Sequence, residues 1–303
     1  MATHTATQTR KPAMIFSSMD FWMIALVIVW GLNFVLIKQA LSELSALVFM
    51  ALRFGLGTLL MLVIWYRAEP QTRIVRADWA PLLALSLIGH TLYQALFVSA
   101  IKFSTVGNTS LILATAPIWV ALFSALRKID PFSKRAWCGV WLSFAGLTLI
   151  IRANGPIAFG SGTLLGDLLM LGAAICWGAY AVLAKPFLQK YSATTFTTWT
   201  MVAGGVPLFF IGLPDLLQLN LGAIHASTWL TLLYSASLAI AIGYIIWNAG
   251  IARLGQARTA VYSNLVPIVA LVIGVIFLGE DLTWLKLSGA AIVLTGLSVA
   301  RRG

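Results

Sequence analysis

Long apolar runs separated by short polar stretches dominate the chain. Continuous apolar runs of roughly 17–25 residues are typical of membrane-spanning helices, whereas the strands of a membrane barrel alternate apolar and polar residues. The pattern therefore predicts an all-α integral membrane protein with ten transmembrane helices. The predicted spans cover residues 22–40, 46–66, 79–101, 107–127, 135–152, 165–184, 195–213, 228–252, 257–278 and 284–300.

Two of these runs contain a proline at matching places. Pro117 and Pro267 are each followed by isoleucine, and Thr109 precedes the first proline at the spacing at which Thr259 precedes the second. A proline cannot donate a backbone hydrogen bond, and its ring crowds the carbonyl four residues earlier. Spans interrupted at corresponding places in two halves indicate a transporter's binding site. Alternatively, each proline only kinks a packed helix, which membrane proteins tolerate.

Further residues recur at a fixed distance along the chain, at an offset of 147 near the start and of 150 later. The matched pairs include Trp30 with Trp177, Lys38 with Lys185, Gly139 with Gly289 and Gly146 with Gly296. We therefore expect a short N-terminal tail, residues 1–20, and a five-helix unit present twice, in residues 21–153 and 154–303. Because five is odd, the second unit starts on the opposite side of the membrane. The repeats are then inverted, which suits alternating access.

Helix ends and helix surfaces also follow a pattern. Ser133 and Thr283 stand where N-caps are expected, before the fifth and tenth spans. The glycines of those spans recur every seven residues, which predicts close helix packing rather than ligand binding.

Composition supports a membrane protein, and charge orients it. The chain is 60% hydrophobic and 10% charged, whereas soluble domains carry about 25% charged residues. The net charge of +11 does not require nucleic acid as a partner, because its placement has another explanation. With the N-terminus in the cytoplasm, fifteen Lys and Arg residues fall on the inner side and four on the outer side. This asymmetry predicts that both termini are cytoplasmic.

The matched pieces carry a family resemblance. The doubled Trp-Gly motif that ends at Lys38 and Lys185, Pro117, and the run from Leu254 to Gly296 resemble the drug/metabolite transporter superfamily in its EamA branch. The overall pattern is most similar to the YddG-type amino-acid exporters. The resemblance implies a ten-helix carrier of small metabolites in a bacterial inner membrane and leaves the substrate open. Tyr180 occupies in the second unit the position that Asn33 has in the first, and Asn264 the position of Ala114. The two halves of a pocket would therefore differ chemically.

Polar and aromatic residues away from the helix ends form the predicted substrate pathway. They are Trp30, Asn33, His90, Tyr93, Gln94, Thr115, Trp177, Tyr180, Tyr244, Trp247, Asn248, Tyr262 and Asn264, with Pro117 and Pro267 as kink or gating positions. An amide in lipid is costly unless it is paired, so these residues should face the interior of the bundle. For any single residue, the alternative is a hydrogen bond that holds the helices together.

Arg53 is the one charged residue well inside a span. Intramembrane charges commonly mark function, and Arg53 would then attract a substrate carboxylate or support gating. Alternatively, it snorkels outward, since it lies in the outer part of its helix.

The remaining polar residues favour facilitated transport. All nine acidic residues lie at helix ends or in loops, so His90 alone stands where a coupling proton would be carried. No phosphate-binding Walker loop is present, which argues against ATP as the energy source. A proton-coupled exporter of drugs or other metabolites and a channel-like pore remain alternatives.

A pathway of Trp, Tyr, Asn and Gln with at most one charge suits a small neutral or zwitterionic solute, such as an amino acid. Three scattered histidines give no clustered catalytic or metal-binding residues, so we expect a transporter without cofactors rather than an enzyme. Cys138 and Cys176 lie in apolar spans and are expected to be packing residues. Ten helices with an internal repeat can form a complete pathway, so a monomer is sufficient.

Overall fold

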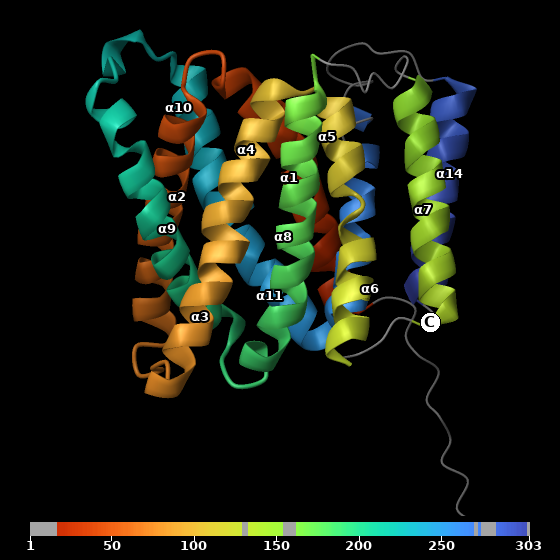
Figure 1. Ribbon diagram of the computed structural model, residues 1–303, viewed down its shortest axis with the longest axis horizontal. Coiled ribbons are helices and arrows are strands. Elements are labelled where there is room, and N and C mark those ends of the chain that lie inside the picture. The colour runs from red at the N-terminus through yellow and green to blue at the C-terminus, as the bar shows by residue number, and fades with distance from the viewer. Residues whose placement is uncertain (1–16, 129–132, 154–161, 270–271, 274–282, 302–303) are drawn as a thin grey trace, which may run out of the picture.

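Helices form every regular element that the computed structural model describes, in residues 17–128, 133–153, 162–269, 272–273 and 283–301. They run side by side in one bundle, with the end of α14 and the lower ends of α3 and α6 at the same side (Figure 1). The α-helices are α1 (Ser18–Ala40), α2 (Ala46–Ala68), α3 (Trp79–Ser86), α4 (Tyr93–Phe103), α5 (Val106–Leu113), α6 (Ala116–Arg127), α7 (Lys134–Ala153), α8 (Leu164–Leu188), α9 (Ala193–Leu217), α10 (Ala226–Tyr234), α11 (Gly243–Leu254), α12 (Gln256–Val261) and α14 (Trp284–Arg301). The shorter turns are η1 (Arg76–Asp78), η2 (Leu87–Leu92), η3 (Leu221–Ala223), η4 (Ser235–Ile242) and η5 (Tyr262–Leu265).

Seven helical stretches within the described residues are long and apolar enough to cross a membrane. They are Ser18–Ala40, Ala46–Ala68, Arg76–Phe103, Asn108–Arg127, Leu164–Leu188, Ala193–Leu217 and Ala226–Leu254. The chain is therefore a multi-pass membrane protein. Helix α7 does not meet the same criteria, the apolar helix in α14 is shorter, and the predicted span 257–278 runs partly outside the described residues. The count of ten spans stays a prediction.

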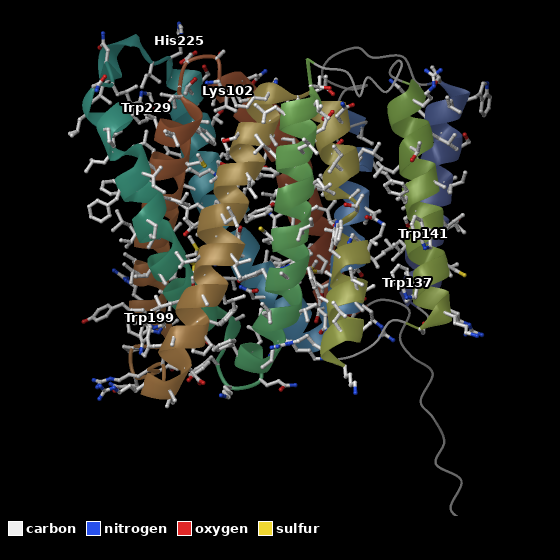
Figure 2. The ribbon with its side chains drawn as sticks, viewed as in Figure 1. Lys102, Trp137, Trp141, Trp199, His225 and Trp229 are labelled. Carbon is white, nitrogen blue, oxygen red and sulfur yellow. The ribbon has the colours of Figure 1, made fainter. Side chains whose placement is uncertain are left out.

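Side-chain hydrogen bonds connect loops at each end of the bundle. At one end, Glu43 accepts from the backbone N–H of His225 at 3.0 Å. At the other, Lys190 forms an ion pair of 3.0 Å with Asp78. We name these ends the His225 end, which is the upper end in Figure 2, and the Lys190 end.

Serine and threonine begin the helices as expected. The hydroxyl oxygen of Ser133 accepts from the Ala136 N–H at 3.0 Å, and that of Thr283 accepts from the Lys286 N–H at 3.3 Å. Both predicted N-caps are confirmed. They satisfy backbone donors that the first turn of a helix otherwise leaves free.

Both proline-containing spans are interrupted at the predicted place. Helix α5 ends at Leu113, and α6 starts anew with Pro117 in its first turn. In the second span the chain tightens into η5 just before Pro267, and the Ser263 carbonyl accepts from the Val266 N–H. The carbonyl that proline displaces is thereby satisfied locally, which hydrocarbon surroundings require.

Helices α7 and α14 lie side by side at one edge of the bundle (Figure 1), and glycines line their contact. A Cβ atom added to Gly146 would lie 2.6 Å from the Gly289 carbonyl oxygen, and one added to Gly296 would lie 2.6 Å from that of Gly139. The predicted packing role of these glycines is confirmed. The contact is also reciprocal. Gly146 approaches Gly289, and their counterparts, Gly296 and Gly139, approach each other in the same way.

Several contacts join a residue to its own counterpart in the other half. These pairs are Trp30 with Trp177 (ring centroids 5.7 Å apart), Gln94 Nε2 with Tyr244 OH (3.0 Å), and Ser143 Oγ with the Val293 carbonyl (3.3 Å). A two-fold axis between equal units produces reciprocal contacts of this kind and brings residues on the axis against their own equivalents.

The third and eighth predicted spans each contain a π-helical turn. Turn η2 separates α3 from α4, and η4 separates α10 from α11. Each π-helical turn holds extra residues, so the side chains beyond it point in a direction that a regular helix would not give them.

Candidate functional site

A cavity lies where helices from both halves meet. Its volume is about 50 Å³, which is enough for a few water molecules. Its walls are Trp30, Asn33, Phe34, Arg53, Tyr93, Gln94, Phe97, Ser110, Leu113, Ala114, Trp177, Ala239, Tyr244, Ser263 and Val266.

Aromatic rings make up much of the wall. Trp177 packs against Tyr93 at 4.8 Å and against Trp247, behind the wall, at 5.0 Å between ring centroids. The Trp30 indole N–H donates to the Ala239 carbonyl at 2.9 Å, which fixes the orientation of that ring. Such rings contribute a large apolar surface in a few defined orientations, and this suits a ligand with an apolar part.

Two amide oxygens at the cavity have no hydrogen-bond partner. Gln94 donates from Nε2 to the Tyr244 hydroxyl, which fixes the amide and leaves Oε1 unpaired. The Oδ1 atom of Asn33 is also unpaired. Buried polar atoms normally have partners, so two free acceptors at one cavity indicate a place for a donor that the protein does not supply.

Arg53 contributes the charge of the site. Its side chain is 3% exposed, and its Nε and Nη1 atoms have no hydrogen-bond partner. The guanidinium carbon lies 5.8 Å from the centre of the Phe49 ring. Arg53 faces the cavity, so the snorkelling alternative is wrong for this structure.

The carboxylates of the described residues are bound elsewhere. Asp20 pairs with Ser17 and Tyr262, Glu43 with His225, Glu69 with Ser192, Asp78 with Lys190, Asp167 with Ser104, and Asp215 with Ser45. Within the described part of the chain, Arg53 therefore has no counter-ion. Asp130, Glu280 and Asp281 lie outside the described residues.

The structure brings six of the predicted pathway residues, and the possible charge site Arg53, to the cavity. They are Trp30, Asn33, Arg53, Tyr93, Gln94, Trp177 and Tyr244. They come from α1, α2, α4, α8 and α11, so residues far apart in sequence meet here.

Another group of predicted residues forms a buried network outside the cavity lining. Asn248 Nδ2 donates to the Tyr180 hydroxyl at 3.0 Å and to Thr197 Oγ1 at 2.8 Å. His90 is fully buried against the rings of Phe54, Tyr180 and Tyr244, and neither of its ring nitrogens has a partner.

The remaining predicted residues also lie away from the lining. The Thr115 hydroxyl donates to the Ile112 carbonyl at 2.6 Å, within its own turn. Tyr262 donates to Asp20 at the start of α1. Asn264 is buried with both amide atoms unpaired, and Trp247 packs against Trp30 at 5.3 Å. The two prolines belong to the interrupted helices rather than to the lining.

Sequence reasoning missed most of the apolar lining. Phe34, Phe97, Leu113, Ala239 and Val266 line the cavity, yet they resemble their neighbours in apolar helices. No local signal distinguishes an apolar residue that faces a cavity from one that faces a helix or lipid.

No group of metal-ligating side chains occurs among the residues that the structure describes. Cys176 is buried as expected of a packing residue, whereas Cys138 is exposed, and both are free thiols. The arrangement is that of a binding cavity with an apolar wall, one cation and two unpaired acceptors.

A solved crystal structure matches the fold. Its chain is 19% identical to this one, with a TM-score of 0.74, and the match covers 94% of this chain and 98% of the other. At this identity the likeness speaks for the fold alone.

Sequence relatives give the family. The chain is 30% identical over 292 residues to a probable amino-acid metabolite efflux pump of Salmonella typhimurium, covering 92% of this chain and 93% of the relative. It is 28% identical over 272 residues to the uncharacterized transporter YyaM of Bacillus subtilis, covering 89% of both. A probable terminal-alkyne amino-acid exporter of Streptantibioticus cattleyicolor is 30% identical over 228 residues, 75% of both chains. The model of the EamA-like transporter family matches residues 17–152 and again 164–302. As the sequence motifs predicted, this chain belongs to the EamA-like transporter family.

Proposed function

We propose that this transporter exports small neutral or zwitterionic metabolites, amino acids above all, by alternating access. The observation that carries the proposal is the aromatic cavity between the two halves, which holds one cation and unpaired acceptors. The relatives named as an amino-acid metabolite efflux pump and an amino-acid exporter support the same substrate class.

The architecture that we propose is ten transmembrane helices arranged as two inverted five-helix repeats, in residues 21–153 and 154–303. The reciprocal glycine contacts of α7 and α14 support a two-fold relation between the repeats. The Lys190 end is the cytoplasmic side in this proposal, because the loops there carry most of the basic residues. Both termini then lie in the cytoplasm of a bacterial inner-membrane protein, and a monomer is sufficient.

Alternating access requires the cavity to open to one side at a time, and contacts near both ends of α1 oppose opening. At the His225 end, Lys38 Nζ donates to the carbonyls of Ile101 and Ser104 at 2.6 and 2.9 Å. At the Lys190 end, Tyr262 donates to Asp20. We propose that one set breaks while the other persists.

We further propose that transport is facilitative. The described residues of the cavity lining include no carboxylate, and His90 lies outside the lining and is surrounded by aromatic rings. Neither arrangement supplies a group that binds substrate and proton in turn. A proton-coupled exporter of drugs or other metabolites, and a channel-like pore, are the alternatives.

Uptake by the purified protein in liposomes tests the proposal. A panel of labelled amino acids would be offered with and without an imposed proton gradient, and internal unlabelled solute would test counterflow. We expect saturable uptake of at least one amino acid, accelerated by counterflow and indifferent to the gradient. Uptake that requires the gradient would overturn the facilitative mechanism. Uptake without saturation would favour a channel, and no amino-acid uptake would remove the substrate class.

A further inference from the structure

We infer that the Arg53 guanidinium is the binding site for a carboxylate of the substrate, and that the free amide oxygens of Asn33 and Gln94 face a donor group of the same molecule. This inference rests on the proposed transport function and deepens it. It names the substrate as an amino acid or another small carboxylate with an apolar part, and it fixes which end of the molecule lies where.

Arg53 places an unpaired charge at the cavity. A guanidinium is always ionised, and an isolated ion in an apolar interior costs far more free energy than one that is paired. Arg53 is 3% exposed, two of its nitrogens lack partners, and its guanidinium lies over the Phe49 ring. Water that entered the cavity would compensate part of this cost. A carboxylate, which matches the planar fork of arginine with two parallel hydrogen bonds, compensates it better.

Two amide oxygens at the cavity suit the end of the substrate that carries no carboxylate. The unpaired oxygens of Asn33 and Gln94 border the same cavity as Arg53. Both oxygens accept and cannot donate, so they suit an ammonium or hydroxyl and not a second carboxylate. The bond from Gln94 to Tyr244 holds one of these oxygens in place. A zwitterion with its carboxylate at Arg53 meets acceptors with its ammonium.

The charge of the described lining also disfavours some classes of solute. Among the described residues, the lining holds one cation and no carboxylate, so an organic cation would be repelled by Arg53 without gaining a counter-ion there. A multiply charged phosphate ester would find a single guanidinium among aromatic rings. The site therefore discriminates by charge, and the rings of Trp30, Tyr93 and Trp177 contact the apolar part.

Three probes that share a phenyl ring separate these contributions. L-phenylalanine carries both charges, 3-phenylpropionate only the carboxylate, and phenethylamine only the ammonium. Binding would be measured by calorimetry on the purified protein in nanodiscs. We expect the wild type to bind the first two, and phenethylamine at least tenfold more weakly than L-phenylalanine. In Arg53→Gln, affinity for both carboxylates should fall about ten- to a hundredfold.

The same variant should bind phenethylamine more tightly than the wild type does, because the repelling charge is gone. A merely structural role of Arg53 would not produce this gain. The matched control is Lys102→Gln, which removes an exposed cation at the His225 end, outside the cavity lining (Figure 2). It should bind all three probes as the wild type does.

Several results would overturn the inference. They are equal binding of the acid and the amine by the wild type, binding of none of the three probes, or unchanged carboxylate affinity in monodisperse Arg53→Gln. Should Arg53→Gln fail to fold, Arg53→Lys keeps the charge but loses the fork, and unchanged carboxylate affinity there would count against the bidentate site. Uptake assays keep the two proposals apart. Transport that persists unchanged in Arg53→Gln would remove the carboxylate site and leave the transporter. Arg53-dependent binding without amino-acid transport would support the carboxylate site and remove the proposed amino-acid transport.

Discussion

Arg53 in the first half and Thr200 in the second stand at the same place in corresponding helices, 147 residues apart. Each follows an N-cap serine, Ser45 or Ser192, by the same number of residues. The Thr200 hydroxyl donates to the Phe196 carbonyl one turn earlier, at 2.9 Å. Arg53 instead presents unpaired nitrogens at the cavity. The same position is structural in one half and, as we infer, a binding position in the other.

The polar residues around the cavity follow the same rule. Gln94 corresponds to Tyr244, and Asn33 corresponds to Tyr180. By contrast, the glycines at the contact of α7 and α14 are identical in both halves. In the alternating access that we propose, a two-fold framework exchanges the conformations of its halves, whereas a substrate with a carboxylate at one end has no two-fold symmetry. The comparison teaches that the glycine contact is alike in the two halves, whereas the polar residues at the cavity differ from their counterparts.

The largest expected effect comes from the matched glycines. In Gly146→Ala and Gly296→Ala the new Cβ would lie 2.6 Å from a backbone oxygen of the facing helix, so the helices must move apart. We expect each change to lower the free energy of unfolding by about 1–3 kcal/mol, and both by similar amounts. Thermal unfolding in detergent, followed by tryptophan fluorescence, measures this.

Gly55→Ala is the matched control for these variants. Its Cβ would lie 3.7 Å from the Phe209 ring, an ordinary contact, and alanine favours the helix. The Gly55→Ala protein should unfold at or slightly above the wild-type temperature. Clearly unequal effects of Gly146→Ala and Gly296→Ala would break the two-fold comparison.

The sequence predicts the framework well, because local chemistry determines it. The N-caps at Ser133 and Thr283, the breaks at Pro117 and Pro267, and the glycine contact follow from the residues themselves. Each depends on a hydrogen bond or a steric limit within a few residues or along one helix face. Such features can be read without knowing which helices are neighbours.

The cavity is less predictable, because its membership depends on tertiary packing. Tyr93 and Gln94 reach the cavity, whereas His90, close by in sequence, lies in the π-helical turn η2 and packs against aromatic rings. A π-helical turn changes which residues share a face, and no proline or glycine rule predicts where it occurs. The sequence likewise leaves the direction of the Arg53 side chain open. A long side chain on a membrane helix can extend into the bundle or outward to the membrane surface.

The next largest effect separates a structural amide from a binding amide. The sequence placed Asn248 in the pathway, but its side chain donates to Tyr180 and Thr197 outside the cavity lining. Asn248→Ala removes the hydrogen bonds to the buried hydroxyls of Tyr180 and Thr197. We therefore expect the free energy of unfolding to fall by about 1–3 kcal/mol. The affinity for transported solute should change little. Thermal unfolding and the KM for uptake, measured together, check this.

Gln94→Leu should behave in the opposite way. It removes an acceptor at the cavity and keeps a side chain of similar size, so KM should rise about five- to tenfold. It also removes one buried hydrogen bond, to Tyr244, whereas Asn248→Ala removes two and shortens the side chain, so the unfolding temperature should change less than in Asn248→Ala. If Asn248→Ala raises KM more than Gln94→Leu does, the cavity boundary is drawn in the wrong place.

The smallest effect concerns two equivalent links of opposite polarity at the two ends of the bundle. Glu43 corresponds to Lys190 and Thr228 corresponds to Asp78, at the offsets of 147 and 150. Glu43 accepts from Thr228 Oγ1 at 2.9 Å, and Lys190 pairs with Asp78 at 3.0 Å. The same two positions are thus joined at both ends, with the acid on opposite partners.

The backbone N–H of His225 and the Thr228 hydroxyl hold the pKa of Glu43 below its usual value of 4.5. A depressed carboxyl pKa contributes stability that is complete above the usual value and is lost as pH falls through the lower, folded value. Glu43→Gln should therefore lose less stability than the wild type between pH 6 and pH 3, by a small margin because the side chain is exposed. Lys102→Gln removes an exposed cation that belongs to neither link, and it should follow the wild-type pH profile. Unfolding midpoints measured across this range decide the matter, and equal slopes for wild type and Glu43→Gln would show that the link at the His225 end contributes nothing to the folded state.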